Sequence, residues 1–510
     1  MTNLNPKSKP ATIREIKDNA PYSNYQLYSY ILSSLSIFIT GLEFTLYSNL
    51  STLMKTKLNL STFENILLNS VIFLGFSFGS MTAGNMESKR TLLLKYSPFI
   101  ILFSHIIMIF FLNEISMIII RILIGLGLGF CLPTSIIIFI EYRNIYYRNF
   151  HCLFIWIFYI LPSFIQCLLI FIIMPNYEEK RIKILLFILT IFVIVQCFFN
   201  FFFSFDSPRH LIYLRENEKG FEILKNINKR NIITEEEKRK ITNEIFDNNA
   251  FKHVENKLVY LMNHNNQNTT LILIYFLFTI SFSLISLYNL NHLTKISIYG
   301  IQLDLNKKII INQLIINLIC LMGMIPLCYI IEKFKIGRKK TMSICFLFSS
   351  IFSFISIILK SMYPIFIGLH LIFSLTSLSI TITYIVEFFC MRIRDLALGF
   401  LIMIFSLSCF FSNVILYIIH NKNYKIAYYL IASLCFISFL LSFLLSYETG
   451  NRPLDSLYME NYHDGFSSES KSNDQNEQEE EEEKKLLNSE NSKDNSKKNE
   501  DLISASSESF

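Results

Sequence analysis

The sequence predicts an all-α membrane protein in which twelve transmembrane helices form two six-helix bundles. The chain of 510 residues is 52% hydrophobic and only 17% charged, whereas a soluble domain carries about 25% charged residues. Twelve apolar runs have the length of about 20 residues that crosses a bilayer. They fall into two groups of six, separated by a polar stretch at residues 205–268. Because lipid offers the backbone no hydrogen-bonding partner, the runs are helices rather than strands.

The apolar runs set the boundaries of the expected helices and domains. The first six runs lie at residues 27–48, 65–84, 92–112, 115–140, 150–174 and 182–204. The last six lie at residues 269–290, 308–331, 341–360, 363–386, 397–419 and 425–446. The expected domains are an N-terminal segment (1–26), a first bundle (27–204), a central loop (205–268), a second bundle (269–446) and a tail (447–510).

The composition also excludes several classes of protein, namely soluble enzymes, disordered proteins and disulfide scaffolds. The ten cysteines lie in or beside apolar runs and form no C-x-x-C pair, so we expect small hydrophobic residues rather than disulfides or metal ligands. No nucleophile constellation, phosphate loop or metal spacing stands out. We therefore expect no catalysis, no cofactor, no nucleic-acid partner and a monomer. Residues 1–19 lack an apolar core, so the first membrane helix would target the protein.

Arginine predicts the orientation in the membrane. Pooled lysines and arginines in the short loops number 12 on one side and 11 on the other, which decides nothing. Arginine alone favours one side, with Arg90, Arg143, Arg148, Arg338, Arg392 and Arg394 against only Arg181. That side also holds both termini and the central loop, so it is expected to face the cytosol. The membrane would be the plasma membrane or that of an organelle.

The central loop and the tail carry different signals. Ser207 followed by Pro208 is typical of a helix start, and Thr234 with Glu237 forms a capping-box pattern. We expect short amphipathic helices on the cytosolic face. From about residue 455 the tail is rich in Ser, Asn and Glu, with an unbroken acidic run at Glu479–Glu483. Such a tail is expected to be disordered and solubilising, with partner binding as the alternative.

The two halves repeat the same landmarks. Glu141 follows Glu87 by 54 residues, and Glu387 follows Glu332 by 55. An arginine lies seven residues after each of the second acids, at Arg148 and Arg394. Duplicated six-helix halves are typical of transporters, whose substrate site lies between the halves near the bilayer midplane.

Polar residues inside the helices predict a shared water-filled space. The first helix carries a stripe on one face, formed by Ser29, Ser33, Ser36, Thr40, Glu43 and Tyr47. Similar stripes on the seventh and tenth helices are Tyr275, Thr279, Ser283, Ser286 and Asn289, and His370, Ser374, Ser377, Thr381 and Tyr384. Glu43 and Arg121 are interior charges, each costing at least ~2.5 kcal/mol if it faces lipid, so each is expected to contact a cavity or a partner.

Six short motifs follow one another between residues 25 and 455. They are Arg121–Pro133 (R-x-x-x-G-x-G-x-G-x-x-L-P), Glu141–Arg148 (E-x(6)-R), Asp206–Arg209, Gly337–Thr341, Glu387–Arg394 and Glu448–Leu454. Because these six motifs occur in this order, the chain resembles the major facilitator superfamily, and within it the synaptic-vesicle-type and organic ion transporter group. The resemblance implies the major facilitator fold and transport of a small polar or charged organic solute by alternating access. Departures are a short loop at Gly84–Arg90 and, in helix seven, no Q-Q-x-x-G pattern of hexose porters.

The resemblance further implies a charge-relay latch at the cytosolic helix ends. Its members would be Glu87, Arg90, Glu141, Arg148, Glu332, Arg338, Lys339, Glu387 and Arg394. A partly desolvated, charge-assisted pair is stronger than a surface pair, so such a latch is physically reasonable. The alternative is that these charges only anchor the topology.

The expected substrate cavity draws on the polar stripes. Its predicted residues are Glu43, Thr40, Tyr47, Arg121, Ser283, Ser286, Asn289, His370, Ser377 and Thr381. Glu43 suits a cationic substrate or a proton, or else it is a packing residue. Arg121 would pair with an anionic group or with Glu43. His105 and His370 are interpreted as satisfied polar residues, and Gly125, Gly127 and Gly129 as close helix packing.

Three functions follow from these expectations. The first is secondary-active or facilitative transport of a small organic solute, with proton coupling left open. The second is a facilitative sugar or polyol carrier. The third is a non-transporting membrane sensor or scaffold that acts through the acidic tail.

Overall fold

The computed structural model describes residues 23–145, 147–174, 181–228, 234–246, 257, 261, 264–299, 303–359, 362–422, 424–445, 447–450, 452 and 454. All of them belong to one compact unit, Met1–Asp455. Within the described residues, twelve helical spans are long and apolar enough to cross a membrane, which confirms the predicted all-α architecture.

The first six crossings form the N-terminal bundle. They are α2 (Asn24–Lys57), α3 (Thr62–Ser70) with α4 (Ile72–Asn85), α5 (Arg90–Phe110), α6 (Glu114–Tyr142), α7 (Arg148–Phe154) with α8 (Ile157–Ile173), and α9 (Ile182–Phe203). A short 3-10 helix, η1 (Glu87–Lys89), precedes α5. The second and fifth crossings are each broken into two helices, at Val71 and at Ile155–Trp156, which the apolar runs do not reveal.

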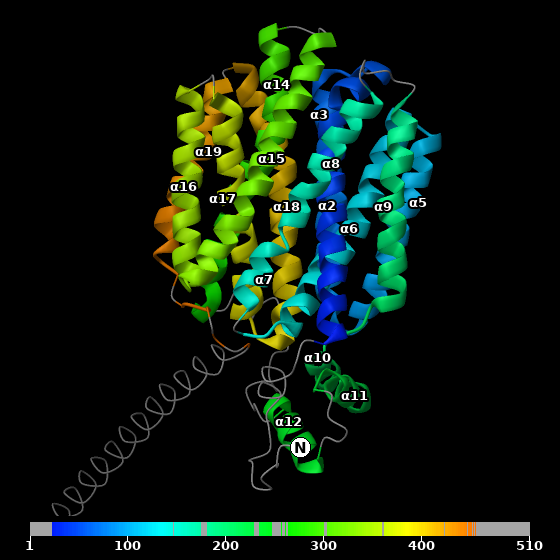
Figure 1. Ribbon diagram of the computed structural model, residues 1–510, viewed down its shortest axis with the longest axis vertical. Helices are drawn as coiled ribbons and strands as arrows, with labels where there is room; N and C mark the ends of the chain where they lie inside the picture. Colours follow the sequence, from blue (N-terminus) through cyan, green and yellow to red (C-terminus); the bar gives the residue numbers. More distant parts are fainter. Residues whose placement is uncertain are drawn as a thin grey trace, which may run out of the picture. The chain divides into compact units, whose positions relative to one another are not determined.

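The last six crossings form the C-terminal bundle. They are α14 (His264–Tyr299), α15 (Leu303–Lys333), α16 (Arg338–Ile358), α17 (Tyr363–Phe388), α18 (Met391–Lys422) and α19 (Tyr424–Ser442). Figure 1 shows α5 and α9 at one edge of the molecule and α16 and α19 at the other, with α2, α14 and α18 between them. The bundles therefore meet along a central seam.

Glycines allow the closest helix approaches. A Cβ atom added to Gly125 or Gly129 of α6 would lie 2.0 Å from the Ile72 carbonyl oxygen or 2.5 Å from that of Phe76, both in α4. This is the close packing that the sequence predicts for those two residues. Across the seam, a Cβ on Gly399 of α18 would lie 2.5 Å from the carbonyl oxygen of Ser80 in α4. The two bundles are thus in backbone contact there.

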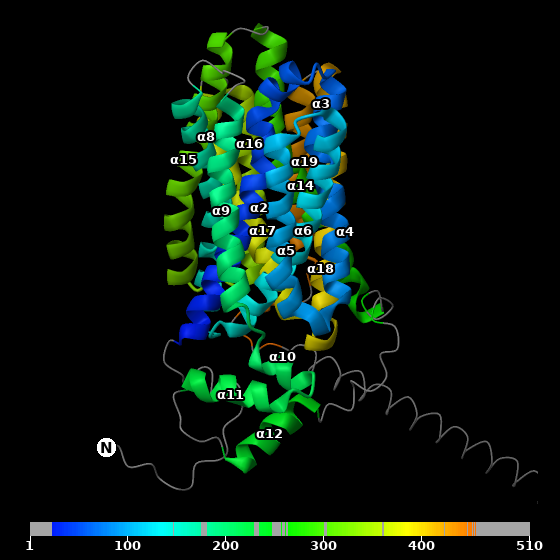
Figure 2. The ribbon, with the colours of Figure 1, turned by 90° about the vertical axis from the view of Figure 1, so that its right-hand side faces the viewer.

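Three short helices of the central loop lie at one end of the bundles, α10 (Pro208–Tyr213), α11 (Asn217–Asn228) and α12 (Glu235–Phe246) (Figure 2). We refer to this end as the α10 end. The Ser207 hydroxyl accepts a hydrogen bond from the His210 amide, and the Thr234 hydroxyl accepts one from that of Glu237, so both predicted caps are present.

The loop helices pack on both bundles. Ile212, Leu224 and Ile241 form a buried cluster with Met391 of α18. Ile227 of α11 joins a second cluster with residues of α5 and α6, including Leu94. The loop helices therefore bridge the seam at the α10 end.

Candidate functional site

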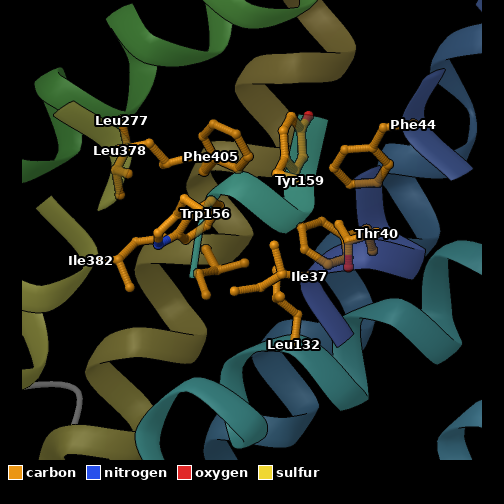
Figure 3. A pocket seen from close by; sticks show the side chains of 12 residues that line it. Ile37, Thr40, Phe44, Leu132, Trp156, Tyr159, Leu277, Leu378, Ile382 and Phe405 are labelled. Carbon is orange, nitrogen blue, oxygen red and sulfur yellow. The ribbon is translucent and has the colours of Figure 1, made fainter. Parts of the chain in front are cut away.

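A narrow cavity lies where the two bundles meet (Figure 3). Its lining residues are Ile37, Thr40, Phe44, Phe76, Leu132, Trp156, Tyr159, Leu277, Leu378, Ile382, Ile402 and Phe405. They come from α2, α4, α6 and α8 of one bundle and from α14, α17 and α18 of the other, with Trp156 at the break between α7 and α8. The volume is about 20 Å³, room for one water molecule. The bundles are therefore closed around their centre in this structure.

Among the predicted cavity residues whose side chains the structure describes, only Thr40 lines this cavity. His370, Ser377, Thr381 and Ser283 are buried elsewhere within the C-terminal bundle. Most of the stripe hydroxyls donate to carbonyl oxygens of their own helix, as Thr40 does to Ser36 and Thr381 to Ser377, both at 2.7 Å. A hydroxyl that bonds its own helix needs no water, so these stripe hydroxyls have partners without an aqueous space beside them. The side chains of Ser286 and Asn289 lie outside the described residues.

The interior charges form a buried group within the N-terminal bundle. Nε2 of His105 (α5) lies 2.5 Å from Oε1 of Glu43 (α2), and both side chains are fully buried. Arg121 (α6) donates to the Glu43 carbonyl oxygen at 3.1 Å, and its Nη1 lies 3.9 Å from Oε2. The guanidinium also lies over the Tyr47 ring, 5.3 Å from its centroid. Glu43, Tyr47 and Arg121 are thus brought together, and His105 is a partner that the sequence interpretation missed.

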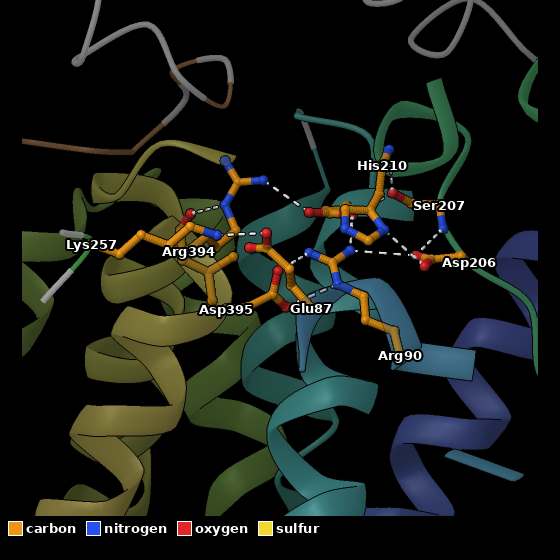
Figure 4. A network of polar contacts seen from close by, with 10 residues as sticks. Glu87, Arg90, Asp206, Ser207, His210, Lys257, Arg394 and Asp395 are labelled. Atoms are coloured by element: carbon orange, nitrogen blue, oxygen red, sulfur yellow. Dashed lines mark hydrogen bonds and ion pairs between the residues drawn. The ribbon is translucent and has the colours of Figure 1, made fainter. Parts of the chain in front are cut away.

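A first ion-pair network closes the seam at the α10 end, formed by Arg90, Glu141, Asp206, Arg394 and Asp395 (Figure 4). Arg90 donates to both oxygens of Asp395 across the seam, at 2.9 and 2.5 Å, and to Glu141 at 3.2 Å. Arg394 returns across the seam to Glu141 at 2.9 Å. All five side chains are buried. Ser207 also donates to Glu141, and His210 contacts Asp206 at 2.8 Å, which ties α10 to the network.

A second ion-pair network repeats this pattern with Arg148, Arg338 and Glu387. Glu387 accepts from Arg338 of its own bundle at 2.9 Å and from Arg148 of the other bundle at 3.3 Å. Arg338 also donates to Asn149, the residue after Arg148, just as Arg90 donates to Asp395, the residue after Arg394. Each glutamate therefore binds one arginine from each bundle, as the internal repeat requires.

The other predicted latch residues lie outside the two networks. Glu87 pairs with Lys257 at 2.5 Å, and Lys339 donates to the carbonyl oxygens of Phe443 and Leu445. Glu332 lies partly buried at the end of α15 and joins neither network. The sequence interpretation missed Asp395 and Asn149 as partners. Aligning the two halves one residue beyond Arg148 and Arg394 would have found both.

Further from the α10 end, a neutral contact crosses the seam. Asn317 of α15 donates to the Ser163 hydroxyl of α8 at 2.9 Å, one turn beyond the cavity residue Tyr159. Both side chains are fully buried. The cavity thus has ion pairs on one side and this hydrogen bond on the other.

Two six-helix bundles around a central cavity, with interbundle contacts on either side of it, define a membrane transporter of the major facilitator class. The chain matches the sugar (and other) transporter family over residues 24–459 and therefore belongs to it. Its function is transport of a small polar or charged solute across a membrane by alternating access, and it is not an enzyme. Among curated protein sequences, none matches the chain.

Solved structures support the fold. The proton:xylose symporter XylE bound to 6-bromo-6-deoxy-D-glucose is 15% identical, with a TM-score of 0.69 over 85% of this chain and 98% of that one. XylE from E. coli in a partially occluded inward-open conformation gives 0.63 at 15% identity, over 85% and 100% of the chains. Its inward-open conformation gives 0.60 at 15% identity, over 85% and 99%.

Proposed function

We propose that this transporter carries an organic solute with an apolar, ring-sized face and couples its movement to a proton. The lining of the central cavity supports the proposed substrate class. Nine of the twelve lining residues have no polar side-chain atom, and five are aromatic, namely Phe44, Phe76, Trp156, Tyr159 and Phe405. Aromatic faces favour a flat partner by about 0.5–1.5 kcal/mol per ring pair.

A sugar fits this lining poorly. Each buried hydroxyl without a partner costs about 1–3 kcal/mol, and a hexose carries five. Only Thr40, Trp156 and Tyr159 offer polar side-chain atoms, and the Thr40 hydroxyl already donates to Ser36. An aromatic or cyclic organic ion, the substrate type suggested by the predicted organic ion subgroup, requires fewer hydrogen-bond partners around its ring. Its charged group must lie outside this lining, which has no charged side chain.

Monosaccharide symport is the second candidate. It is favoured by the family and by the likeness to a xylose symporter. It would require the bundles to bring further polar groups into the cavity as they open.

Proton coupling is supported by the buried Glu43, which has both a basic neighbour and Arg121 beside it. We also propose that the α10 end faces the cytosol, because the loops there carry most of the arginines. We also propose that the two networks are the predicted latch and that the five domain boundaries separate the two moving bundles from the loop and the tails.

The single tryptophan makes the substrate class directly measurable, since Trp156 is the only one in the chain and lines the cavity. Purified protein in detergent is titrated with benzoate, benzylammonium, D-xylose and D-glucose while tryptophan fluorescence is recorded. We expect a saturable change with an aromatic ion and none with either sugar. A saturable response to a sugar alone would reverse the assignment.

A pair of variants on α18 controls for unspecific binding. Phe405 lines the cavity, whereas Phe411 on the same helix is 55% exposed on the outer surface. Phe405→Asn should weaken the fluorescence titration about tenfold, the loss expected for about 1.4 kcal/mol. Phe411→Asn should leave it unchanged.

A further inference from the structure

We propose that His105 and Glu43 hold the coupling proton jointly, as one proton-binding site inside the N-terminal bundle. This inference rests on the proton coupling proposed above and adds a residue to it. The observation behind it is the 2.5 Å contact between Nε2 of His105 and Oε1 of Glu43, with both side chains fully buried.

Thr190 fixes which nitrogen of His105 carries a hydrogen. The Thr190 hydroxyl donates its only proton to the Leu186 carbonyl oxygen of its own helix, at 2.8 Å. Its oxygen lies 3.3 Å from Nδ1 of His105, where it therefore accepts. Nδ1 is then the donor, and in a neutral imidazole the other nitrogen, Nε2, would be an acceptor.

The short contact therefore contains a proton. A carboxylate oxygen and an acceptor nitrogen repel each other at 2.5 Å, so either the imidazole is protonated or the carboxyl is. The proton belongs to the pair whichever way it is written. In the proposed site, this contact corresponds to the loaded form.

Arg121 is positioned to receive the carboxylate when the proton leaves. Its Nε and Nη2 and the Glu43 Oε2 atom have no hydrogen-bond partner among the described residues, although all are buried. Nη1 already lies 3.9 Å from that oxygen. A buried carboxylate needs hydrogen-bond donors. After the proton leaves, Nε2 of His105 is an acceptor, so the donors are Nε and Nη2 of Arg121.

No other charge competes at this site within the described residues. Tyr47 of α2 faces Arg121, but its hydroxyl donates to Asn65 at 2.9 Å. The helix α9 contributes only the Thr190 hydroxyl. The charge on the His105–Glu43 pair is therefore balanced by its own proton and by Arg121.

The cavity lies next to this switch along α2. Phe44 follows Glu43 directly, and Thr40 lies one turn earlier, and both line the cavity. When the Glu43 carboxyl turns from His105 on α5 towards Arg121 on α6, the packing of α2 beside the cavity changes. Loading of the proton can thereby change the affinity for the solute.

The chain supplies a matched control in His370. It is equally buried, but its Nδ1 lies 2.8 Å from the Ser349 carbonyl oxygen and its Nε2 lies 3.2 Å from the Ser374 hydroxyl. No carboxylate contacts it in the part of the chain that the structure describes. Both histidines have partners on both ring nitrogens, as the sequence predicts, but the partners of His370 are neutral whereas one partner of His105 is a carboxyl group.

The experiment uses the full chain in liposomes, with whichever of benzoate, benzylammonium or D-xylose binds in the Trp156 assay as the labelled solute. Two rates are measured for wild type, His105→Gln and His370→Gln: accumulation driven by a pH gradient, and solute exchange at equal pH. Exchange requires no proton release. We expect His105→Gln to lose gradient-driven accumulation about tenfold or more while keeping exchange, and His370→Gln to keep both.

Two results separate the failures. A wild type that accumulates solute with the gradient, together with a His105→Gln variant that does so equally well, overturns the shared site alone. A wild type that ignores the gradient overturns the coupling itself. If His105→Gln loses exchange and therefore does not fold, Thr190→Val is tested in its place. This variant keeps the imidazole ring but removes the hydroxyl that fixes which nitrogen carries the hydrogen. The pH dependence of accumulation must then shift, and an unchanged profile counts against the proposal.

Discussion

At the scale of single residues, burial makes the two ion-pair networks consequential. Removing one partner of a buried pair costs about 3–5 kcal/mol, because the other charge is left without compensation. Arg148 and Arg394 each cross the seam, so their loss should weaken the closed α10 end rather than either bundle.

Arg148→Gln tests this in the second network. It leaves Glu387 paired with Arg338 and Arg338 bonded to Asn149, and it removes the interbundle ion pair between Arg148 and Glu387. We expect the buried thiol of Cys152, on the same helix as Arg148, to react with a maleimide at least about tenfold faster, as measured by mass spectrometry. Glu332→Gln, at a residue outside both networks, is the control and should react as wild type. Equal rates in all three proteins would mean that the pair does not hold the seam.

The residue scale also shows where the sequence was insufficient. The repeat made Glu141, Arg148, Glu387 and Arg394 predictable, because duplicated positions coincide in spacing. His105 had no such signal, since its partner Glu43 lies 62 residues away on another helix. Only the fold, in which α2 and α5 both pack against α6 and α9, reveals that pair.

At the scale of elements, the crossing of α4 and α18 holds the bundles together. Gly84 and Gly399 face each other there, and a Cβ on Gly399 would lie 2.8 Å from the Gly84 Cα atom. Neither helix backbone can yield without moving its bundle. The crossing thus depends on residues without a side chain.

Gly399→Ala is therefore expected to disturb the seam. Overpacking of this kind costs about 1–3 kcal/mol, and the neighbouring atoms are backbone. Thermal unfolding in detergent should occur at lower temperature, and uptake should fall. Gly323→Ala is the comparison, because its Cβ would meet the movable end of the Ile372 side chain within one bundle. A Gly399→Ala protein at least as stable as Gly323→Ala would contradict this role.

The elements themselves were largely predictable from the sequence. Every predicted apolar run corresponds to a helical span, because length and hydropathy alone define a crossing. The breaks at Val71 and at Ile155–Trp156 were not predictable, since neither contains Gly or Pro. Whether the stripe hydroxyls face water was also not predictable, because a hydroxyl that bonds its own helix looks the same in sequence as a hydroxyl that faces water.

At the scale of the whole molecule, alternating access requires the seam to open on one side of the cavity at a time. Ion pairs close the α10 end, and the Asn317–Ser163 contact lies beyond the cavity from it. Because this neutral contact is weaker than the buried ion pairs, we expect the end away from α10 to open first to the solute. Fixing that side should stop the cycle without damaging either bundle.

The most direct measurement is solute uptake by the Ser163→Cys/Asn317→Cys variant, treated with a short bifunctional methanethiosulfonate in liposomes. These two side chains lie 2.9 Å apart on opposite bundles. We predict that the bridged protein loses uptake and that a reductant restores it, while Ser163→Cys alone is unaffected. Undiminished uptake by fully bridged protein would contradict movement of the bundles about the central cavity.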